Sequence, residues 1–290
     1  MRRGFIGATI VTSLLGSGMV AAGGTASAAV NPWPHTAVGG FSTSAGKGYA
    51  VIFADGAVDT RGIDMQYPGA SGFLLAGPIV GGANAPSGIG EWLVASDGGV
   101  FAFLSARFFG SMGAARLNQP VFSMAASKSG RGYWLVARDG GVFAFGDAHF
   151  YGSTGAIRLN QPMAGITRGP TGRGYRLVAR DGGIFSFGDA PFYGSLPGRG
   201  VRVADVVGMA PTPTGRGYWI AEANGSVYAF GDAQNLGGFN ETPGFCDPVV
   251  GIFSNPVSQG YRLVLQSGGT IAAGNAPGGD FADGPPMRCG

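Results

Sequence analysis

The chain has 290 residues, of which 57 are glycine, 12% are charged and 45% are hydrophobic. Glycine does not recur at every third position, which excludes collagen, and 20 Phe, 9 Tyr and 4 Trp argue against a disordered chain. The formal charge of +3 becomes +1 without Arg2 and Arg3, because 17 basic and 16 acidic residues remain, and this balance gives no support to a nucleic-acid partner. Such a composition predicts short apolar strands joined by tight turns.

Residues 1–28 predict an export signal. Arg2 and Arg3 form its positive end, a moderately apolar stretch follows, and Ala26-Ser27-Ala28 provides a small-residue cleavage site. The start Arg2-Arg3-Gly4-Phe5-Ile6 resembles a twin-arginine signal, and an ordinary Sec signal is an equal alternative. We therefore expect a secreted protein with a short extension at 29–36. No later apolar stretch reaches the length of a membrane span.

A repeat of about 42 residues fills the rest of the chain. Residues 131–148 recur at 173–190 with Trp134 replaced by Arg176 and two conservative changes, and less complete copies lie at 217–233 and 91–103, with weaker ones from Gly48 and Gly260. Aligned by one turn position, the copies are spaced 42, 42, 42, 43 and 43 residues apart. The residues at that position are Asp55, Asp97, Asp139, Asp181, Asn224 and Ser267. Six repeats are thus predicted over 37–290.

Each copy has the pattern of a small antiparallel sheet. In one copy, the apolar runs 133–137 and 142–145 flank the turn dipeptide Asp139-Gly140, which predicts a hairpin. The runs 150–153 and 163–167 raise the expectation to four strands, the size of a propeller blade. Because one sheet cannot cover its own two faces, ring closure would bury both. We predict an all-β, six-bladed β-propeller and leave open which strand closes the ring.

The aromatic pairs of the second apolar run are predicted to pack between blades. They are Phe101, Phe103, Phe143, Phe145, Phe185, Phe187, Tyr228 and Phe230.

The repeat resembles a known family. Residues 132–153 read Gly-Tyr-Trp-Leu-Val-Ala-x-Asp-Gly-Gly-Val-Phe-x-Phe-Gly-Asp-Ala-x-Phe-Tyr-Gly-Ser, which is similar to repeats of largely uncharacterised proteins secreted by actinobacteria. The likeness covers nearly the whole mature chain. It implies an extracellular, cell-wall-associated or accessory role. In that family the repeats often accompany a peptidase, amidase or glycoside hydrolase domain, which this chain lacks, and the family supplies no active site to transfer.

One position varies between copies and is the predicted ligand-binding position. It follows the first aromatic residue of each hairpin and holds Ala50, Trp92, Trp134, Arg176, Trp219 and Arg262. A residue that the scaffold requires should recur in every copy, whereas a residue that binds a ligand can differ between copies. The Trp and Arg side chains are predicted either to stack on sugars and read anions, or to shield the blade edges at the rim.

Aspartates recur at two other positions. Asp147, Asp189 and Asp232 follow a glycine at the end of the second apolar run, where the other copies have Ser105 and Asn275. A ring of carboxylates would suit a cation or sugar hydroxyls. A short acidic side chain between strands also caps turns, and we expect that role here and for the hairpin residues Asp97, Asp139 and Asp181.

Catalytic chemistry has few residues to use. The only histidines are His35 and His149, so a Ser-His-Asp arrangement or a His-rich metal site is hard to assemble, and we predict no catalytic residue, metal or cofactor. Paired carboxylates remain an alternative, although no spacing among the acids outside the repeat pattern indicates a pair. Those acids are Asp59, Asp64, Glu91, Asp205, Glu222 and Glu241.

The two cysteines, Cys246 and Cys289, lie 43 residues apart, at equivalent positions of successive copies. In an exported chain they predict a disulfide that staples the C-terminus to the connection between blades 5 and 6. A crosslink between molecules is the alternative.

Together these patterns predict a secreted, monomeric, non-catalytic binding or scaffold module for cell-wall polysaccharide or an extracellular protein. Two alternatives stay open. One is a carbohydrate-active propeller enzyme with paired carboxylates, and the other is a structural surface protein without a small ligand.

Overall fold

The structure is a computed structural model that describes residues 31–86, 89–239 and 246–276. The predicted export signal, Glu241 and Cys289 lie outside these residues. Within them the chain forms eighteen short strands and a single turn of 3₁₀ helix, η1 (Pro197–Arg199).

The strands follow one another in six groups of three. Blade 1 has β1 (Ala37–Ser42), β2 (Tyr49–Phe53) and β3 (Val58–Arg61), and blade 2 has β4 (Ile79–Asn84), β5 (Gly90–Ala95) and β6 (Val100–Leu104). Blade 3 has β7 (Val121–Ala126), β8 (Gly132–Ala137) and β9 (Val142–Gly146), and blade 4 has β10 (Met163–Arg168), β11 (Gly174–Ala179) and β12 (Ile184–Gly188). Blade 5 has β13 (Val206–Pro211), β14 (Gly217–Glu222) and β15 (Val227–Gly231), and blade 6 has β16 (Val249–Ser254), β17 (Gly260–Leu265) and β18 (Thr270–Gly274).

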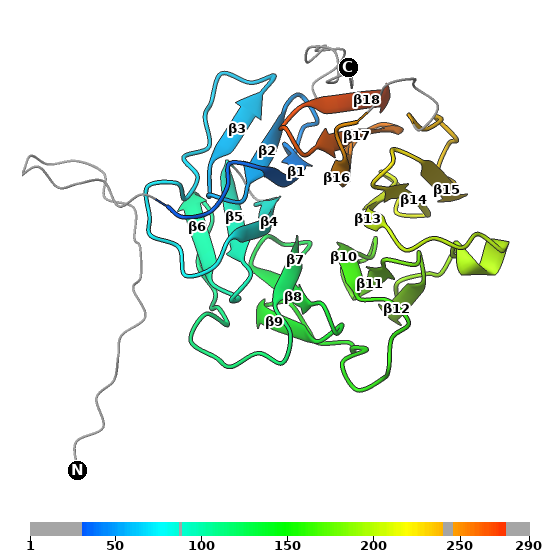
Figure 1. Cartoon of the computed structure of the whole chain (residues 1–290), viewed down its shortest axis with the longest axis horizontal. Coiled ribbons are helices and arrows are strands. Elements are labelled where there is room, and N and C mark those ends of the chain that lie inside the picture. Colours follow the sequence, from blue (N-terminus) through cyan, green and yellow to red (C-terminus); the bar gives the residue numbers. More distant parts are fainter. Residues whose placement is uncertain (1–30, 87–88, 240–245, 277–290) are drawn as a thin grey trace, which may run out of the picture.

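Each group is an antiparallel sheet with its strands in chain order, and the six sheets stand around a common axis (Figure 1). The first strand of every blade lies nearest the axis and contacts the first strands of both neighbouring blades. The second strand is buried along its whole length in all six blades, since it has a neighbour on each side and a blade against each face. The predicted all-β, six-bladed propeller is confirmed.

The blades have three strands in the described structure, and the prediction of four was wrong. The run 150–153 is apolar enough for a strand, yet its backbone pairs with a side chain of the next blade. The Tyr175 hydroxyl accepts a hydrogen bond from the Tyr151 N–H (3.2 Å) and donates one to the Gly152 carbonyl (2.5 Å). With these groups satisfied by one phenol, no strand ladder forms.

The hairpin turns between second and third strands are built as predicted. Asp139 accepts a hydrogen bond from the Gly141 N–H at 3.0 Å, and the intervening Gly140 has a φ of 80°, which favours glycine. The same turn contact recurs from Asp55, Asp97, Asp181, Asn224 and Ser267. These residues shape turns, as the sequence indicated.

Small residues allow the inner strands to converge. Every inner strand has a bulge near its start, for example between Val249 and Gly251, and five of the six have glycine at its end. A Cβ placed on Gly251 would lie only 3.1 Å from the Cα of Gly39 in the neighbouring blade. A larger residue there would push the two blades apart.

A single backbone hydrogen bond joins the inner strand of each blade to the hairpin turn of the blade before it. At one junction the Ile79 N–H donates to the Ala54 carbonyl at 2.9 Å. The ring closes in the same way, because the Ala37 N–H donates to the Gln266 carbonyl at 2.9 Å. Strand β1 therefore belongs to blade 1 and does not complete blade 6, which answers the question that the repeat left open.

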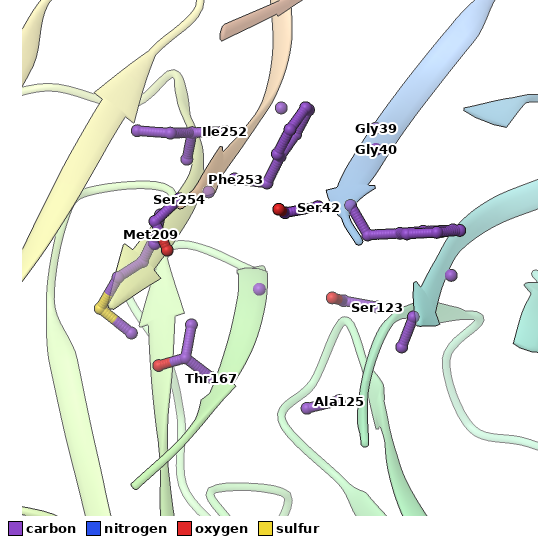
Figure 2. Close-up of a pocket in the computed structure, with 18 of the residues that line it drawn as sticks. Gly39, Gly40, Ser42, Ser123, Ala125, Thr167, Met209, Ile252, Phe253 and Ser254 are labelled. Atoms are coloured by element: carbon purple, nitrogen blue, oxygen red, sulfur yellow. The ribbon is translucent and has the colours of Figure 1, made fainter. Parts of the chain in front are cut away.

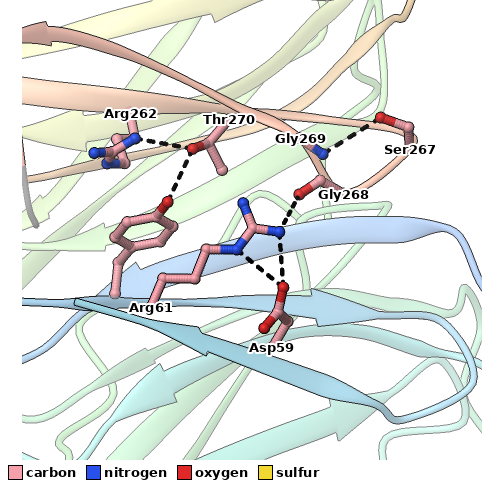
Figure 3. A network of polar contacts seen from close by, with 8 residues as sticks. Asp59, Arg61, Arg262, Ser267, Gly268, Gly269 and Thr270 are labelled. Atoms are coloured by element: carbon pink, nitrogen blue, oxygen red, sulfur yellow. Dashed lines mark hydrogen bonds and ion pairs between the residues drawn. The ribbon is translucent and has the colours of Figure 1, made fainter. Parts of the chain in front are cut away.

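Polar side chains add to the closing junction (Figure 3). Arg61 bonds Asp59 at 2.7 Å and donates across to the Gly268 carbonyl of blade 6 at 3.2 Å. Asp59 and Arg61 occupy the positions that hold the phenylalanine pair in blades 2 to 4. In those blades the pair packs between sheets, as predicted, and Phe145, for example, lies against Gly110 of the preceding blade.

Candidate functional site

The five residues predicted to bind a ligand lie inside the junctions between blades. Their side chains are at most 1% exposed, so they form neither a ligand surface nor a shield at the rim. Each lies against the first aromatic residue of the next blade. The contacts are Trp92 on Tyr133 (5.5 Å), Trp134 on Tyr175 (5.5 Å), Arg176 on Tyr218 (5.3 Å), Trp219 on Tyr261 (5.4 Å) and Arg262 on Tyr49 (4.3 Å).

Trp and Arg are interchangeable at this position because both have a flat face and an N–H that reaches the same acceptor. The indole N–H of Trp134 donates to the His149 carbonyl at 2.7 Å, and Nε of Arg176 donates to the equivalent Pro191 carbonyl at 2.6 Å. Trp92 and Trp219 repeat this bond with Arg107 and Gln234. The variation between copies thus preserves one packing function and does not mark a ligand surface.

The junction between blades 1 and 2 is the exception. Ala50 replaces Trp or Arg, and Glu91 replaces tyrosine. The Glu91 side chain is fully buried, and one carboxyl oxygen accepts a hydrogen bond from the Gly69 N–H at 3.2 Å while the other has no described partner. Burial raises the pKa of Glu91 to about 7, against the lowering effect of the Gly69 bond.

The aspartates after the third strands cap neighbouring loops. Asp147 accepts hydrogen bonds from the hydroxyls of Ser127 (2.8 Å) and Ser129 (2.5 Å), and Arg131 lies 3.6 Å away. Asp189 and Asp232 make the equivalent bonds with Thr171, and with Thr212 and Thr214. The prediction was a turn cap that accepts backbone N–H groups, whereas the donors described are side-chain hydroxyls of a neighbouring loop, so the role is structural and its partners differ from those expected.

Two of the acids outside the repeat pattern come together, which no spacing indicated. Glu222 ends β14, and its pKa is raised by burial and by the charge of Asp205, which precedes β13. The equivalent positions elsewhere hold apolar residues for Glu222, and mostly proline for Asp205, so comparison of the copies at both positions was the available signal. Glu222 is only 3% exposed and neither acid lines the central cavity described below.

The remaining candidates for chemistry are scattered. His35 stacks on Phe53 and its Nδ1 lies 2.8 Å from Asp55, while His149 is exposed in the segment that follows β9. Asp64 is exposed, and Asp59 pairs with Arg61. The described residues contain no group of three His, Cys, Asp or Glu that is placed to hold a metal ion. Cys246 is described and its predicted partner is not, so their pairing stays a prediction.

A hollow lies on the propeller axis. It is a cavity of about 570 Å³ lined by residues from all six inner strands and the loops that follow them (Figure 2). This volume lies in the range of small-molecule sites, and the lining is already formed by the closed ring. Sequence reasoning could not find it, because no single repeat contains it.

The cavity lining combines aromatic, hydroxyl and small apolar groups. Phe41 and Phe253 contribute rings. Ser42, Ser123 and Ser254 contribute hydroxyls from strands of different blades (Figure 2). The one charged side chain among the described lining residues is Arg168, the last residue of β10. An aromatic face beside hydroxyls suits a ligand with both apolar and hydroxyl-bearing faces.

Comparison with known proteins identifies the fold only. No protein-family model and no curated protein sequence matches the chain. Among solved structures, it is similar to a structural genomics protein of unknown function from Bacteroides thetaiotaomicron VPI-5482, with a TM-score of 0.56 and 11% identity over 83% of this chain and 69% of that one. It is also similar to the Cps50 (Swd1) β-propeller domain of Myceliophteria thermophila, with a TM-score of 0.54 and 12% identity over 83% of each chain.

Helices contribute almost nothing to the described part of the chain. None of those residues belongs to a helix with the length and apolar character needed to cross a bilayer.

Proposed function

We propose that this protein is a secreted binding module that holds cell-wall glycan, or an extracellular protein, and that the ligand enters the central cavity. The cavity of about 570 Å³ carries the proposal, because it joins the rings of Phe41 and Phe253 to the hydroxyls of Ser42 and Ser254. Aromatic faces pack against the C–H faces of sugars, and hydroxyl groups exchange hydrogen bonds with sugar hydroxyls.

The composition of the lining favours binding over the paired-carboxylate alternative. None of the described lining residues is a carboxylate, and the two acids that do meet, Asp205 and Glu222, lie away from the cavity. A glycosidase needs two carboxyl groups flanking the scissile bond in a space that admits substrate. Among the described residues, the central cavity therefore lacks the two carboxyl groups that a glycosidase mechanism requires.

The test is retention of the purified mature protein on isolated actinobacterial cell wall, together with a glycan array. We expect the wild-type protein to be retained and Ser254→Trp, which fills the cavity, to lose retention. Ser111→Trp is the matched control, because Ser111 is exposed and outside the cavity lining. Wild-type protein that is neither retained nor bound on the array would contradict a wall-glycan ligand. Retention unaffected by Ser254→Trp would place the ligand outside the cavity.

We also propose that Cys246 pairs with Cys289 within one molecule. The support is their placement at equivalent points of successive repeats in an exported chain. A non-reducing gel separates the alternatives, since an intramolecular bond leaves a monomer band and a crosslink between molecules gives a dimer.

A further inference from the structure

Arg168 differs from its counterparts in the other blades. It is the last residue of β10, and the equivalent residues at the ends of the other inner strands are uncharged. They are Ser42, Asn84, Ala126, Pro211 and Ser254. Because five blades form the same strand without a charge, the scaffold does not require an arginine here. The side chain nevertheless lines the cavity.

The guanidinium of Arg168 has no hydrogen bond or ion pair with any described residue. Other cations near this end of the inner strands are engaged, since Arg131 and Arg173 lie 3.6 and 3.4 Å from Asp147 and Asp189, and Lys128 donates to the Pro170 carbonyl. Burial lowers the pKa of Arg168, which means that its charge has lost part of its hydration. Arg168 is partly buried, and a partly dehydrated cation without a partner gains from an anion that reaches it.

The surroundings of Arg168 carry more basic than acidic side chains. The loops that follow the inner strands hold Lys47, Lys128, Arg131, Arg173 and Arg216, and the aspartates that bind these loops from the ends of the third strands are Asp147, Asp189 and Asp232. The three aspartates are already held by hydroxyl groups of those loops. This end of the cavity is therefore electropositive and attracts anions.

We propose that the cavity binds a saccharide that carries a carboxylate or phosphate group, with that anionic group paired to the Arg168 guanidinium. Ser42 and Ser254 lie at the same height on other blades and would hydrogen-bond the sugar hydroxyls. The planar guanidinium presents two N–H groups side by side, which matches both kinds of anion. This inference rests on the proposed function and narrows its ligand class.

Two matched pairs of probes test the charge by calorimetric titration. The first is trigalacturonic acid and its trimethyl ester, and the second is glucose 6-phosphate and glucose. We expect the wild-type protein to bind the anionic member of at least one pair about ten- to a hundredfold more tightly than the neutral member, the usual strength of a charge-assisted bond. Which pair shows the preference distinguishes a carboxylate from a phosphate ligand.

Variants locate that preference. Arg168→Gln should abolish it and Arg168→Lys should keep part of it. Arg158→Gln should leave it unchanged, because Arg158 is exposed and outside the cavity lining while its loss changes the net charge equally. Circular dichroism confirms that each variant folds, and the wild-type comparison needs no variant at all.

Equal wild-type affinity within both pairs would overturn the anionic ligand, and so would a preference that survives Arg168→Gln. The absence of binding to all four probes would do the same. Each of these results can occur while the wild-type protein is still retained on cell wall and the Ser254→Trp variant loses that retention. Failure of the inference is therefore distinguishable from failure of the proposed function.

Discussion

Five of the six junctions between blades share one construction, and the junction between blades 1 and 2 departs from it. In the five, an indole or guanidinium packs against the tyrosine of the next blade, and the three indoles are tilted at 55–58° to the tyrosine ring. At the exception, Ala50 faces a blade whose tyrosine is replaced by the buried carboxyl group of Glu91. Tyr67, which is 4% exposed, packs into the apolar cluster of this junction with Ala50.

The two constructions have opposite energetics. A junction of this kind buries apolar area and contains no carboxyl group in its stacked pair, and each of its indoles donates its N–H within the blade, so its strength should not change with pH near neutrality. The exceptional junction buries the carboxyl group of Glu91, whose charged form is destabilised by burial and whose neutral form is favoured. A repeat protein can therefore contain one junction whose strength depends on pH among five that do not.

The largest effect is expected where an aromatic contact is removed. Trp134→Ala deletes the indole between blades 3 and 4 and leaves the His149 carbonyl without its donor, so the free energy of unfolding should fall by about 3–5 kcal/mol in denaturant titration. Phe150→Ala is the control, because Phe150 is 60% exposed and its loss should change stability by less than about 0.5 kcal/mol. Equal losses for the two variants would refute the role assigned to the aromatic junctions.

The exceptional junction should show itself in the pH dependence of stability. The pKa of Glu91 is about 7 in the folded chain against 4.5 ordinarily, so the folded state binds its proton more tightly than the unfolded state. The contribution of Glu91 to stability should therefore be largest below pH 4.5, decline as the pH rises, and level off above pH 7, with a total loss of about 3 kcal/mol. Urea titrations at several pH values measure this decline.

Glu91→Gln should remove that part of the decline and make the protein more stable at pH 8. A smaller slope should remain, because burial and Asp205 raise the pKa of Glu222 in the same direction. Asp64→Asn, at an exposed acid, should leave the profile as it is. A profile of Glu91→Gln identical to that of the wild type would mean that Glu91 does not govern the junction.

The smallest change is expected from exchanging the two residue types that share a position. Arg176→Trp should alter the free energy of unfolding by less than about 1 kcal/mol, because an indole there can donate to the Pro191 carbonyl as the Trp134 indole does to the His149 carbonyl. It also removes a guanidinium nitrogen that is buried without a partner. Thermal unfolding followed by circular dichroism would measure the change. A loss above about 2 kcal/mol would show that the guanidinium itself is needed.

The architecture could be predicted from the sequence because a period of 42 residues and the turn at Asp139-Gly140 are local signals. The fourth strand could not, because the run 150–153 has strand-like residues and its fate depends on the Tyr175 hydroxyl of another blade. The position that holds Trp or Arg was wrongly predicted to be exposed for a related reason. Trp134 and Arg176 are chemically different residue types, yet both pack a planar group between blades and donate an N–H to the same backbone position.

The candidate site was beyond the reach of the sequence. Phe41, Arg168 and Phe253 lie in three different repeats, 127 and 85 residues apart along the chain, and they share a cavity only after six inner strands meet around one axis. In an alignment of the six repeats, Arg168 is the charged residue at a position where the other copies have uncharged residues. The register of the inner strands is needed to show that this position ends each inner strand.

The way the ring closes has a mechanical consequence. Blades are held to one another by side-chain packing, by side-chain hydrogen bonds such as those of Tyr175, and by a single bond between backbone groups such as that from Ala37 to Gln266, whereas strands within a blade share a full ladder. Tension applied to the two ends of the chain should therefore part a junction before it unzips a sheet. The protein should lengthen in steps of one blade, each releasing about 140–150 Å of extended chain.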